Sequence, residues 1–315
     1  MPSVSASSSP VRIKFWGTRG SIAVPGSGTL RYGGNTTCAE VRADGEIVVF
    51  DAGSGIRPLG LALDEEFQAQ PIKLSLFITH AHWDHIQGFP FFKPAYDPKS
   101  EIRIFGFDGT GASFQQILAE PMKAPFFPIA MRELSAKMDI EKLTEMNFSI
   151  GKVEIQAAFV NHPGVCAGYR LFTSAGSIAF LPDYEPYEFF LHSARINHLT
   201  PEEAKKTAAD ERASLVEFLH GSDVLILDAQ YTDEEYKKHI GWGHGSISSA
   251  VSLALDAEVH TLLLFHHDPN HDDRTVEAME QSARELVAKS GRPLKIAAAQ
   301  EGGEILLEAK KIAAA

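Results

Sequence analysis

A short apolar segment followed at once by three histidines and an aspartate is the feature that most constrains this chain. Residues 74–79 read Leu-Ser-Leu-Phe-Ile-Thr, and residues 80–85 read His-Ala-His-Trp-Asp-His. The first segment is short, prone to β structure and preceded by a proline, so we predict a buried strand whose end delivers the histidines onto a loop. Four ligand-type side chains within six residues are typical of a metal site rather than of a solvated polar loop.

The spacing within this segment suits two ions. Alternate residues of an extended chain face the same side, so we expect His80 and His82 to reach one ion. Asp84 and His85 lie beyond the predicted strand end, and we expect them to turn toward a second ion. One segment could therefore contribute ligands to a pair of metals.

Three other predicted strands also end in residues of this kind. Their ends are followed by His162, by Asp183, and by the pair His266 and His267. A single polar residue after a strand is common turn chemistry. Because the pattern recurs beside the cluster at residues 80–85, we predict that these residues complete a metal site.

Strands and helices are interleaved along the chain, and no low-complexity linker separates two domains. We predict one α/β domain of two layered β-sheets over residues 11–315, preceded by a disordered tail at residues 1–10. Residues 184–220 are polar with a helical pattern, and we expect an insertion that serves as a lid, an arm or a contact in a homodimer. The strands are expected at residues 11–16, 40–50 (a hairpin), 74–79, 102–107, 153–160, 168–173, 177–181, 224–227 and 262–265, and the helices at residues 56–68, 111–119, 201–219, 246–257 and 275–290.

The charge and cysteine content exclude several kinds of partner and site. The net charge is −12, from 29 Lys and Arg against 41 Asp and Glu, and there is no basic stripe with interleaved aromatics, so we do not expect long nucleic acids to bind. Cys38 and Cys166 are far apart, which indicates neither a disulfide framework nor a thiolate zinc site. No stretch approaches the ~20 apolar residues of a membrane span. We expect a cytoplasmic protein without membrane contact.

The order of these residues resembles that of the metallo-β-lactamase fold hydrolases, whose hallmark is H-x-H-x-D-H followed by a distant His, an Asp and a last His. The resemblance covers nearly all of residues 11–308. It implies an αββα sandwich of two layered mixed β-sheets flanked by helices, and a centre of two divalent metal ions. By resemblance, the first ion takes His80, His82 and His162, the second takes Asp84, His85 and His266, and Asp183 bridges both.

Two features of this ligand set stay open. Either His266 or His267 could be the last ligand; His266 is preferred because it follows the apolar run directly, as His80 does. His267, Asp268 and His271 would then orient it or line the mouth of the site. Imidazoles and carboxylates without a thiolate suit Zn²⁺ or Mn²⁺, with Fe as a further candidate. These ligand types do not distinguish among the three metals.

Glycine-rich motifs outside the ligand set resemble the phosphodiesterase branch of this fold, which includes tRNA 3′-end processing nucleases and bacterial cyclic-nucleotide phosphodiesterases. By the same resemblance, Asp51 supports the histidine cluster. Arg19 could contact phosphate, but it is a lone cation on a glycine loop, and we expect it to be solvated. The motifs are GTRGS at residues 17–21, GGNTT at 33–37, FDAG at 50–53 and GWGHGS at 241–246.

His244 is the predicted catalytic residue outside the ligand set. Its glycine loop leads into a helix predicted from Ser246, so its imidazole could face a phosphate near a helix N-terminus, where anions are favoured. There it could donate a hydrogen bond to a phosphoryl oxygen or a proton to the leaving alkoxide. Asp228 is expected to hold His244 in the useful tautomer, and Asp84 could accept a proton from the nucleophile. A solvated histidine and a simple turn aspartate are the alternatives.

We therefore predict a binuclear metal phosphodiesterase that hydrolyses a small diester, with 3′,5′-cyclic nucleotides as the preferred substrates. The acidic composition favours small over polymeric substrates, and no Gly/Pro-rich basic arm for gripping tRNA is evident. A tRNA 3′-end processing nuclease is the alternative within the same class. A non-catalytic metal-bound sensor and an iron oxidoreductase are alternatives from other classes, since one fold hosts many functions.

Overall fold

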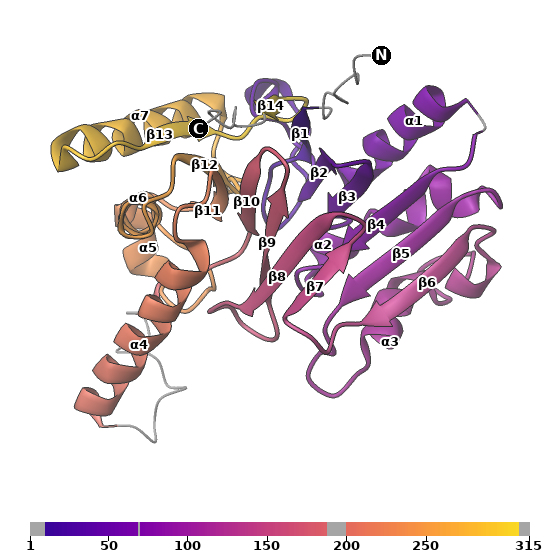
Figure 1. The fold of residues 1–315 in the computed structure, drawn as a ribbon, viewed down its shortest axis with the longest axis horizontal. Helices are drawn as coiled ribbons and strands as arrows, with labels where there is room; N and C mark the ends of the chain where they lie inside the picture. Colours follow the sequence, from indigo (N-terminus) through magenta and orange to yellow (C-terminus); the bar gives the residue numbers. More distant parts are fainter. Residues whose placement is uncertain (1–9, 69, 188–199, 309–315) are drawn as a thin grey trace, which may run out of the picture.

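Two seven-stranded β-sheets packed face to face form the centre of the molecule (Figure 1). The computed structural model describes residues 10–68, 70–187 and 200–308. The strands are β1 (Val11–Gly17), β2 (Cys38–Ala43), β3 (Glu46–Phe50), β4 (Lys73–Phe77), β5 (Glu101–Gly106), β6 (Lys137–Lys142), β7 (Asn147–Ile150), β8 (Val153–Phe159), β9 (Ala167–Thr173), β10 (Gly176–Leu181), β11 (Val224–Asp228), β12 (Thr261–Phe265), β13 (Lys295–Ala298) and β14 (Glu304–Leu307). The first sheet has the order β14-β1-β2-β3-β4-β5-β6 and the second the order β13-β12-β11-β10-β9-β8-β7.

Helices lie on the two outer faces of this pair of sheets, which confirms the predicted αββα arrangement (Figure 1). Helices α1 and α3 pack on the first sheet, and α4, α6 and α7 pack on the second. The α-helices are α1 (Ile56–Phe67), α2 (Trp83–Ile86), α3 (Phe114–Ala119), α4 (Pro201–Leu219), α5 (Asp233–His239), α6 (Ile247–Asp256) and α7 (Asp273–Ser290).

Three buried apolar layers hold the sandwich together. The middle layer lies between the sheets, where the ring of Phe50 stacks on Phe180 with centroids 4.8 Å apart and Phe77 stacks on Phe105 at the same distance. The outer layers lie between each sheet and its helices. Strands covered on both faces read as continuous apolar runs, which explains why β11 (VLILD) and β12 (TLLLF) are recognisable in the sequence.

Parallel strands bring several loops to one edge of the sandwich. β3, β4, β5 and β6 are mutually parallel in the first sheet, as are β10, β11, β12 and β13 in the second. β8 runs antiparallel to β9, which runs antiparallel to β10, so β8 ends at the same edge as β10. The residues that follow these strands can therefore meet across the two sheets.

Several elements were not predicted, and each lacks a clear pattern. β6 (KMDIEK) is a charged edge strand, and β7, β13 and β14 are four residues long, too short to show alternation. α5 exposes or half-exposes every residue, so it has no apolar stripe. α2 is a single turn inside the histidine segment.

The predicted insertion at residues 184–220 is described only in part, since residues 188–199 lie outside the described ranges. α4 begins after a capping box in which Thr200 and Glu203 satisfy each other's backbone N–H groups. Figure 1 shows α4 extending away from the sheets. Arg212 on α4 forms an ion pair with Asp256 of α6 at 2.8 Å, which ties α4 to the helices that cover the second sheet. The predicted tail lies almost wholly outside the described residues.

None of the described helices is both long enough and apolar enough to cross a membrane.

Candidate metal centre

The histidine segment leaves its strand earlier than predicted. β4 ends at Phe77, so His80 lies three residues beyond it, and the strand alternation proposed for His80 and His82 does not apply. Instead, His82 is the extended residue before α2, and the single turn of α2 holds Asp84 and His85. The change from extended chain to helix between residues 82 and 83 is what turns the two halves of the segment in different directions.

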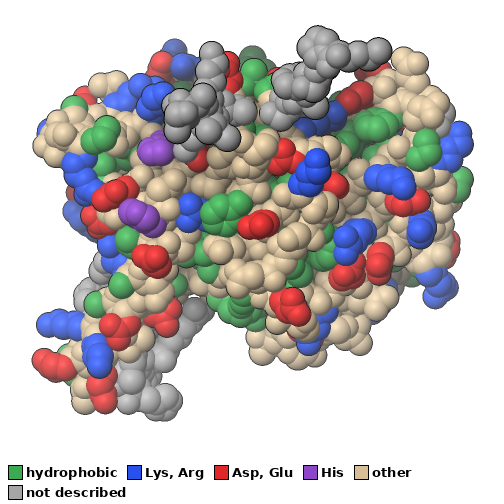
Figure 2. Space-filling view, viewed as in Figure 1, with side chains coloured by type: hydrophobic (Ala, Val, Ile, Leu, Met, Phe, Trp, Pro, Cys, Tyr) green, Lys and Arg blue, Asp and Glu red, His purple; other side chains and the backbone are tan. Residues whose placement is uncertain are grey.

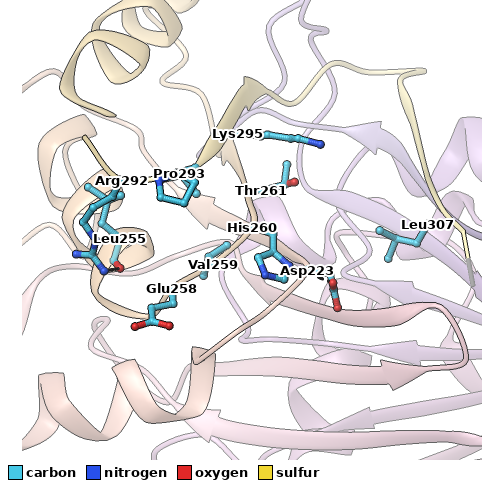
Figure 3. Close-up of a pocket in the computed structure, with 11 residues that line it drawn as sticks. Asp223, Leu255, Glu258, Val259, His260, Thr261, Arg292, Pro293, Lys295 and Leu307 are labelled. Atoms are coloured by element: carbon cyan, nitrogen blue, oxygen red, sulfur yellow. Dashed lines mark hydrogen bonds and ion pairs between the residues drawn. The ribbon is translucent and has the colours of Figure 1, made fainter. Parts of the chain in front are cut away.

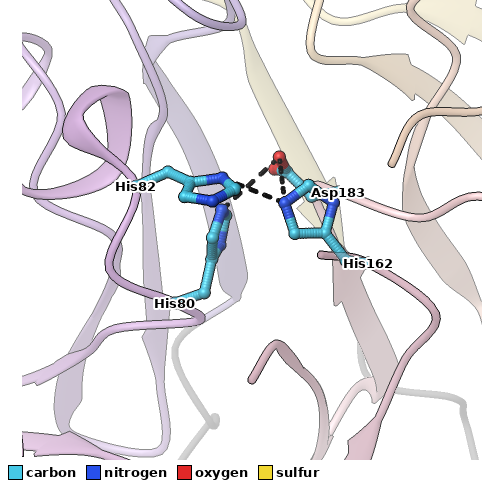
Figure 4. A group of neighbouring side chains, drawn as sticks. All are labelled: His80, His82, His162 and Asp183. Carbon is cyan, nitrogen blue, oxygen red and sulfur yellow. Dashed lines mark hydrogen bonds and ion pairs between the residues drawn. The ribbon is translucent and has the colours of Figure 1, made fainter. Parts of the chain in front are cut away.

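The first cluster contains three imidazoles and one carboxylate. Their ligand atoms all lie within 4.8 Å of one another, and Figure 4 shows His80 and His82 of one segment facing His162 and Asp183 of two others. His162 Nε2 lies 3.0 Å from His82 Nδ1. Asp183 Oδ2 lies 3.6 Å from His80 Nε2 and 3.7 Å from His162 Nε2. His82 is the one exposed member of this group, so it marks the side from which solvent reaches the centre.

The second cluster lies on the other side of Asp183. Asp84, His85 and His266 place ligand atoms within 4.8 Å of one another. Asp84 Oδ2 is 3.2 Å from both His85 Nε2 and His266 Nε2. Asp183 Oδ1 is 3.0 Å from His85 Nε2 and 3.3 Å from His266 Nε2. The two oxygens of Asp183 thus face different clusters, which is the geometry expected of a bridging ligand.

These residues fit a pair of divalent metal ions. His80 Nε2, His85 Nε2 and Asp183 Oδ1 are buried and have no hydrogen-bond partner. Buried polar atoms in folded proteins are almost always satisfied, so three of them divided between the two clusters are the donors expected around metal ions. Imidazole and carboxylate donors suit Zn²⁺, Mn²⁺ or Fe, and the donor set alone does not identify the metal.

The ring nitrogens that face away from the clusters are held by neighbours, as in metal sites generally. These contacts fix the orientation of each ring. The pairs are His80 Nδ1 with Thr79 Oγ1 at 3.1 Å, His85 Nδ1 with Asp51 Oδ2 at 2.8 Å, His162 Nδ1 with the Gly243 carbonyl at 2.8 Å, and His266 Nδ1 with Gln230 Oε1 at 2.9 Å.

Two of these residues adopt a backbone conformation that side chains other than glycine rarely take. Asp51 and His266 both have a φ of 60°. Asp51 also accepts hydrogen bonds from the backbone N–H and hydroxyl of Thr79, which hold it in place. Strained residues of this kind persist where the surrounding structure fixes them, and they gather at functional sites.

The clusters strongly perturb one another's protonation. Burial lowers the pKa of His80 well below its ordinary value and that of His162 to about 4. Burial also disfavours the charged form of His85, but the surrounding carboxylates outweigh it and raise the pKa of His85 well above the ordinary value. For Asp183, burial is outweighed by nearby imidazoles, which lower its pKa. Metal binding therefore requires a proton to leave His85.

His244 and Asp228 form a buried pair beside the clusters. His244 Nδ1 lies 2.7 Å from Asp228 Oδ2, and the His244 ring stacks on that of His266 with centroids 4.8 Å apart. Asp228 also accepts the backbone N–H groups of Tyr184 and Gln230. Burial lowers the pKa of His244, but the charge and hydrogen bond of Asp228 outweigh it and raise the pKa to about 9. Without metals, His244 is therefore protonated at neutral pH.

Glu185 organises the loop that carries His244, and it was not predicted. Its side chain is 1% exposed and accepts the backbone N–H groups of Gly241 at 2.6 Å and Gly243 at 2.9 Å. Gly243 has a φ of 96°, and a Cβ there would lie 2.5 Å from His162 Nδ1. The loop therefore needs glycine at this position to approach His162 closely. Glu185 lies only two residues after Asp183, but nothing in its local sequence marks a partner more than fifty residues away.

One expectation about the neighbours of His266 is wrong. His267 does not line the site: its Nε2 lies 2.9 Å from the Ala299 carbonyl. Its neighbour Asp268 acts indirectly, by accepting a hydrogen bond from Gln230, the residue that orients His266. The geometry therefore places His266, and not His267, in the cluster.

Arg19 is fully buried rather than solvated. Its guanidinium donates to the carbonyl oxygens of Gly33, Asp268 and His271, so it fastens the β1–β2 loop to the β12–α7 loop. His271 is likewise occupied elsewhere, since its Nε2 lies 2.9 Å from Glu235 Oε1. Neither residue faces the clusters, because both serve the packing of the loops behind them.

A separate cavity of about 740 Å³ lies at the opposite edge of the second sheet (Figure 3). It is lined by residues at the starts of β11, β12 and β13, among them Asp223, Thr261 and Lys295. The side chains of the two clusters follow the other ends of the strands. In open parallel sheets ligands bind at the carboxyl ends, so this cavity is not part of the metal centre.

Comparison with known proteins identifies the family. The sequence family described as the β-lactamase superfamily domain matches residues 47–267. The chain belongs to this superfamily. Two relatives named ribonuclease Z extend over most of it: that of Haloarcula marismortui is 23% identical, covering 81% of this chain and 86% of the relative, and that of Pyrococcus horikoshii is 25% identical, covering 75% and 82%.

Solved structures of β-lactamase superfamily proteins have the same fold. The metallo-β-lactamase fold protein YhfI from Bacillus subtilis matches with a TM-score of 0.64 at 16% identity, covering 95% of this chain and 100% of that one. The short form of human tRNase Z matches with a TM-score of 0.57 at 17% identity, covering 94% and 99%. The predicted fold is confirmed, as is the prediction of a metal-dependent phosphodiester hydrolase.

Proposed function

We propose that this β-lactamase superfamily protein cleaves phosphodiester bonds in RNA, with the 3′ end of precursor tRNA as the first substrate to test. Relatives that match most of the chain are named ribonuclease Z. This favours the nuclease alternative over the cyclic nucleotides preferred from the sequence. The expectation of a small substrate rested on the acidic composition, which describes the whole surface and not the site.

The observation that carries the phosphodiester assignment is the His244–Asp228 pair beside a two-metal ligand set. Bond cleavage in a phosphodiester needs an activated nucleophile and a proton for the leaving oxygen. His244 is buried to 8% exposure, lies within reach of both clusters and carries a proton in the metal-free protein. A histidine that is not needed to complete either predicted ligand set can serve as the proton donor.

The proposed roles divide between binding and proton transfer. His80, His82 and His162 would hold one ion, and Asp84, His85 and His266 the other, with Asp183 between them. Such ions supply Lewis-acid activation of water and of the phosphoryl oxygens when bound. Asp228 orients the His244 imidazole through Nδ1, so that Nε2 is the nitrogen left to carry a proton to the leaving oxygen. The backbone N–H of Ser21 donates to Asp84 Oδ2 at 2.8 Å and helps to fix that carboxylate.

The surface charge limits how RNA can be held. Figure 2 shows basic and acidic side chains interspersed over the face in view, and the chain carries a net charge of −12. Proteins that neutralise many phosphates bind with a steep dependence on salt. We therefore propose that few phosphates are contacted, at the scissile bond and its nearest neighbours, and that kcat/KM depends only weakly on salt concentration.

The test is a substrate panel with metal-reconstituted protein. Zn²⁺- and Mn²⁺-loaded enzyme would be assayed on precursor tRNA with a 3′ trailer, on 3′,5′-cyclic AMP and on bis(p-nitrophenyl) phosphate. Cleavage of the precursor at a defined 3′ position, lost in His244→Ala and retained in His260→Ala, supports the proposal; His260 is an exposed histidine on the far edge. Turnover of cyclic AMP without cleavage of the precursor would restore the cyclic-nucleotide prediction. Full metal content without hydrolysis of any diester would favour a non-catalytic sensor.

A further inference from the structure

An apolar pocket opens beside the metal centre, and one of its walls is the residue between two predicted ligands. Trp83 lies between His82 and Asp84, whose side chains turn to the two clusters. Its own side chain is 62% exposed. Consecutive Cα atoms are about 3.8 Å apart, so the Cα atom of Trp83, which lines the pocket, lies about that far from the Cα atom of His82.

The pocket has a volume of about 360 Å³ and is lined largely by apolar residues from two segments of the chain. Ala81, Trp83 and Ile86 come from the histidine segment, and Ile117, Pro121 and Phe126 come from α3 and the chain after it. This is within the range of small-molecule sites.

The two aromatic rings of the pocket do not serve the core. Trp83 is 62% exposed and Phe126 is 73% exposed, whereas most aromatic side chains of the three core layers are buried. Large exposed aromatics that gather in one hollow usually mark a binding site. Because Trp83 is held by a turn whose other side chains are predicted to bind metal, its position relative to the centre is fixed.

We propose that this hollow, the Trp83 pocket, binds a nucleobase of the nucleotide next to the scissile phosphate; the inference rests on the function proposed above. Aromatic side chains stack on bases of any sequence because every base has a π face. A nucleotide whose phosphate lies at the metal centre would extend its base past His82 onto the indole. An RNA-cleaving enzyme with few basic contacts would thereby hold its substrate by stacking rather than by charge.

Polar groups at the rim of the pocket suit the edge of a base. Gln116 uses its amide oxygen to accept the N–H of Ser113 in a capping box, so its NH₂ group is the part that can donate to a ligand. Glu120 also lines the pocket and offers a carboxylate acceptor, which is paired with Lys123. A donor and an acceptor beside two ring faces match a base better than they match an acyl chain.

The test compares two RNA substrates that differ only in one base. Both carry the same scissile phosphate, and in one the adjacent nucleotide is abasic. We expect wild type to cleave the abasic substrate with a KM about 10-fold higher, since a stacked base contributes an amount of that order. Trp83→Ala should raise KM for the intact substrate by a similar factor and leave the abasic substrate unchanged, whereas Trp83→Phe should retain most of the wild-type KM.

Control variants and substrates distinguish failure of the Trp83 pocket proposal from failure of the proposed RNA cleavage. Phe91→Ala removes an aromatic side chain that is 57% exposed but does not line the pocket, and it should match wild type. If Trp83→Ala loses metal, Phe126→Ala tests the contribution of the other aromatic ring that lines the pocket. Equal KM for both substrates in wild type, with efficient cleavage, would overturn the pocket and leave the RNA proposal standing. Failure of wild type to cleave either substrate would overturn both, and bis(p-nitrophenyl) phosphate would then show whether any diester is hydrolysed.

Discussion

The carboxylate of Asp228 lies 2.7 Å from Nδ1 of His244, and it holds the ring that stacks on the predicted metal ligand His266. His244 thus belongs to the same buried unit as the clusters. With Asp183 and His266 it also places ligand atoms within 4.8 Å of one another, although neither of the two ligand sets described above needs it. Its contribution can be separated from metal binding by substitution.

His244→Ala should keep both metals and lose activity. General acid catalysis typically contributes about 10² to 10⁴ in rate, so we expect kcat on RNA to fall by at least ~10²-fold. Metal content by elemental analysis and kcat by single-turnover assay check this prediction. Unchanged kcat in a variant with full metal content would refute the role of His244 as proton donor.

Asp228→Asn should lower the pKa of His244 in the metal-free protein from about 9 toward its ordinary value, because the carboxylate charge is lost. A raised imidazole pKa stabilises the folded protein fully below the unfolded value of about 6.5, and the contribution is lost as pH rises through the folded value. Wild type should therefore lose stability between about pH 6.5 and 9, and the variant should lose less. NMR titration of the imidazole and denaturant unfolding across this range measure both effects. Parallel stability curves for the two proteins would contradict the prediction.

Asp51→Asn should weaken the second metal site. Removing the charge that orients a metal-binding histidine typically costs about 10- to 100-fold in affinity. Asparagine tolerates the positive φ of residue 51, so the backbone should be preserved. Titration against a chromophoric chelator measures the affinity. Asp44→Asn is the matched control, because Asp44 has a similar φ of 54° but lies in the β2–β3 turn; equal affinities for the two variants would count against the role of Asp51.

Gly243→Ala should lose the first metal and the activity together. The new Cβ would lie 2.4 Å from Pro163 Cδ and 2.5 Å from His162 Nδ1, so the loop or the ligand must move. Gly164→Ala provides the control, since Gly164 has a φ of 93° and a Cβ added there would meet nothing within 4 Å. That variant should show only backbone strain, roughly 1 kcal/mol, with its metals retained. The measurement is metal content and Tm for both proteins, and retention of metal in Gly243→Ala would show that the close approach is dispensable.

Glu185→Gln should loosen the loop that carries His244. Glutamine keeps only one acceptor oxygen and carries no charge. One of the two backbone N–H groups would therefore lose its acceptor, at a cost of about 1 to 3 kcal/mol in the free energy of unfolding. We expect kcat to fall more than metal affinity, because the second cluster does not depend on this loop. Urea unfolding and steady-state kinetics test this, with the exposed Glu154→Gln as control. An unchanged kcat would mean that the loop is held by its own backbone.

The candidate ligand residues could be proposed from the sequence because they are encoded locally. His80, His82, Asp84 and His85 stand in one short segment, and the later candidates His162, Asp183 and His266 each follow a strand. A strand that is buried on both faces leaves a continuous apolar run, so its end can be located without an alignment. The two layered sheets follow from the same runs.

The supporting residues were not predictable because their partners lie far along the chain. Glu185 binds Gly241 across 56 residues, and Gln230 binds His266 across 36. Arg19 was expected to be solvated, yet its guanidinium donates to one carbonyl oxygen of its own loop and to two of the distant β12–α7 loop. No local pattern marks such contacts, since they are created by the packing of the two sheets.

The placement of Asp183 has a consequence for how the metal centre fills. Each of its oxygens faces a different cluster, so in the proposed centre an ion in one site would change the charge, orientation and proton affinity that the other site offers. Linkage requires this influence to be equal in both directions: whatever factor the first ion applies to the affinity of the second, the second applies to the first. The two sites therefore constitute one thermodynamic unit, whose apparent affinity for either metal is defined only when the occupancy of the other is stated.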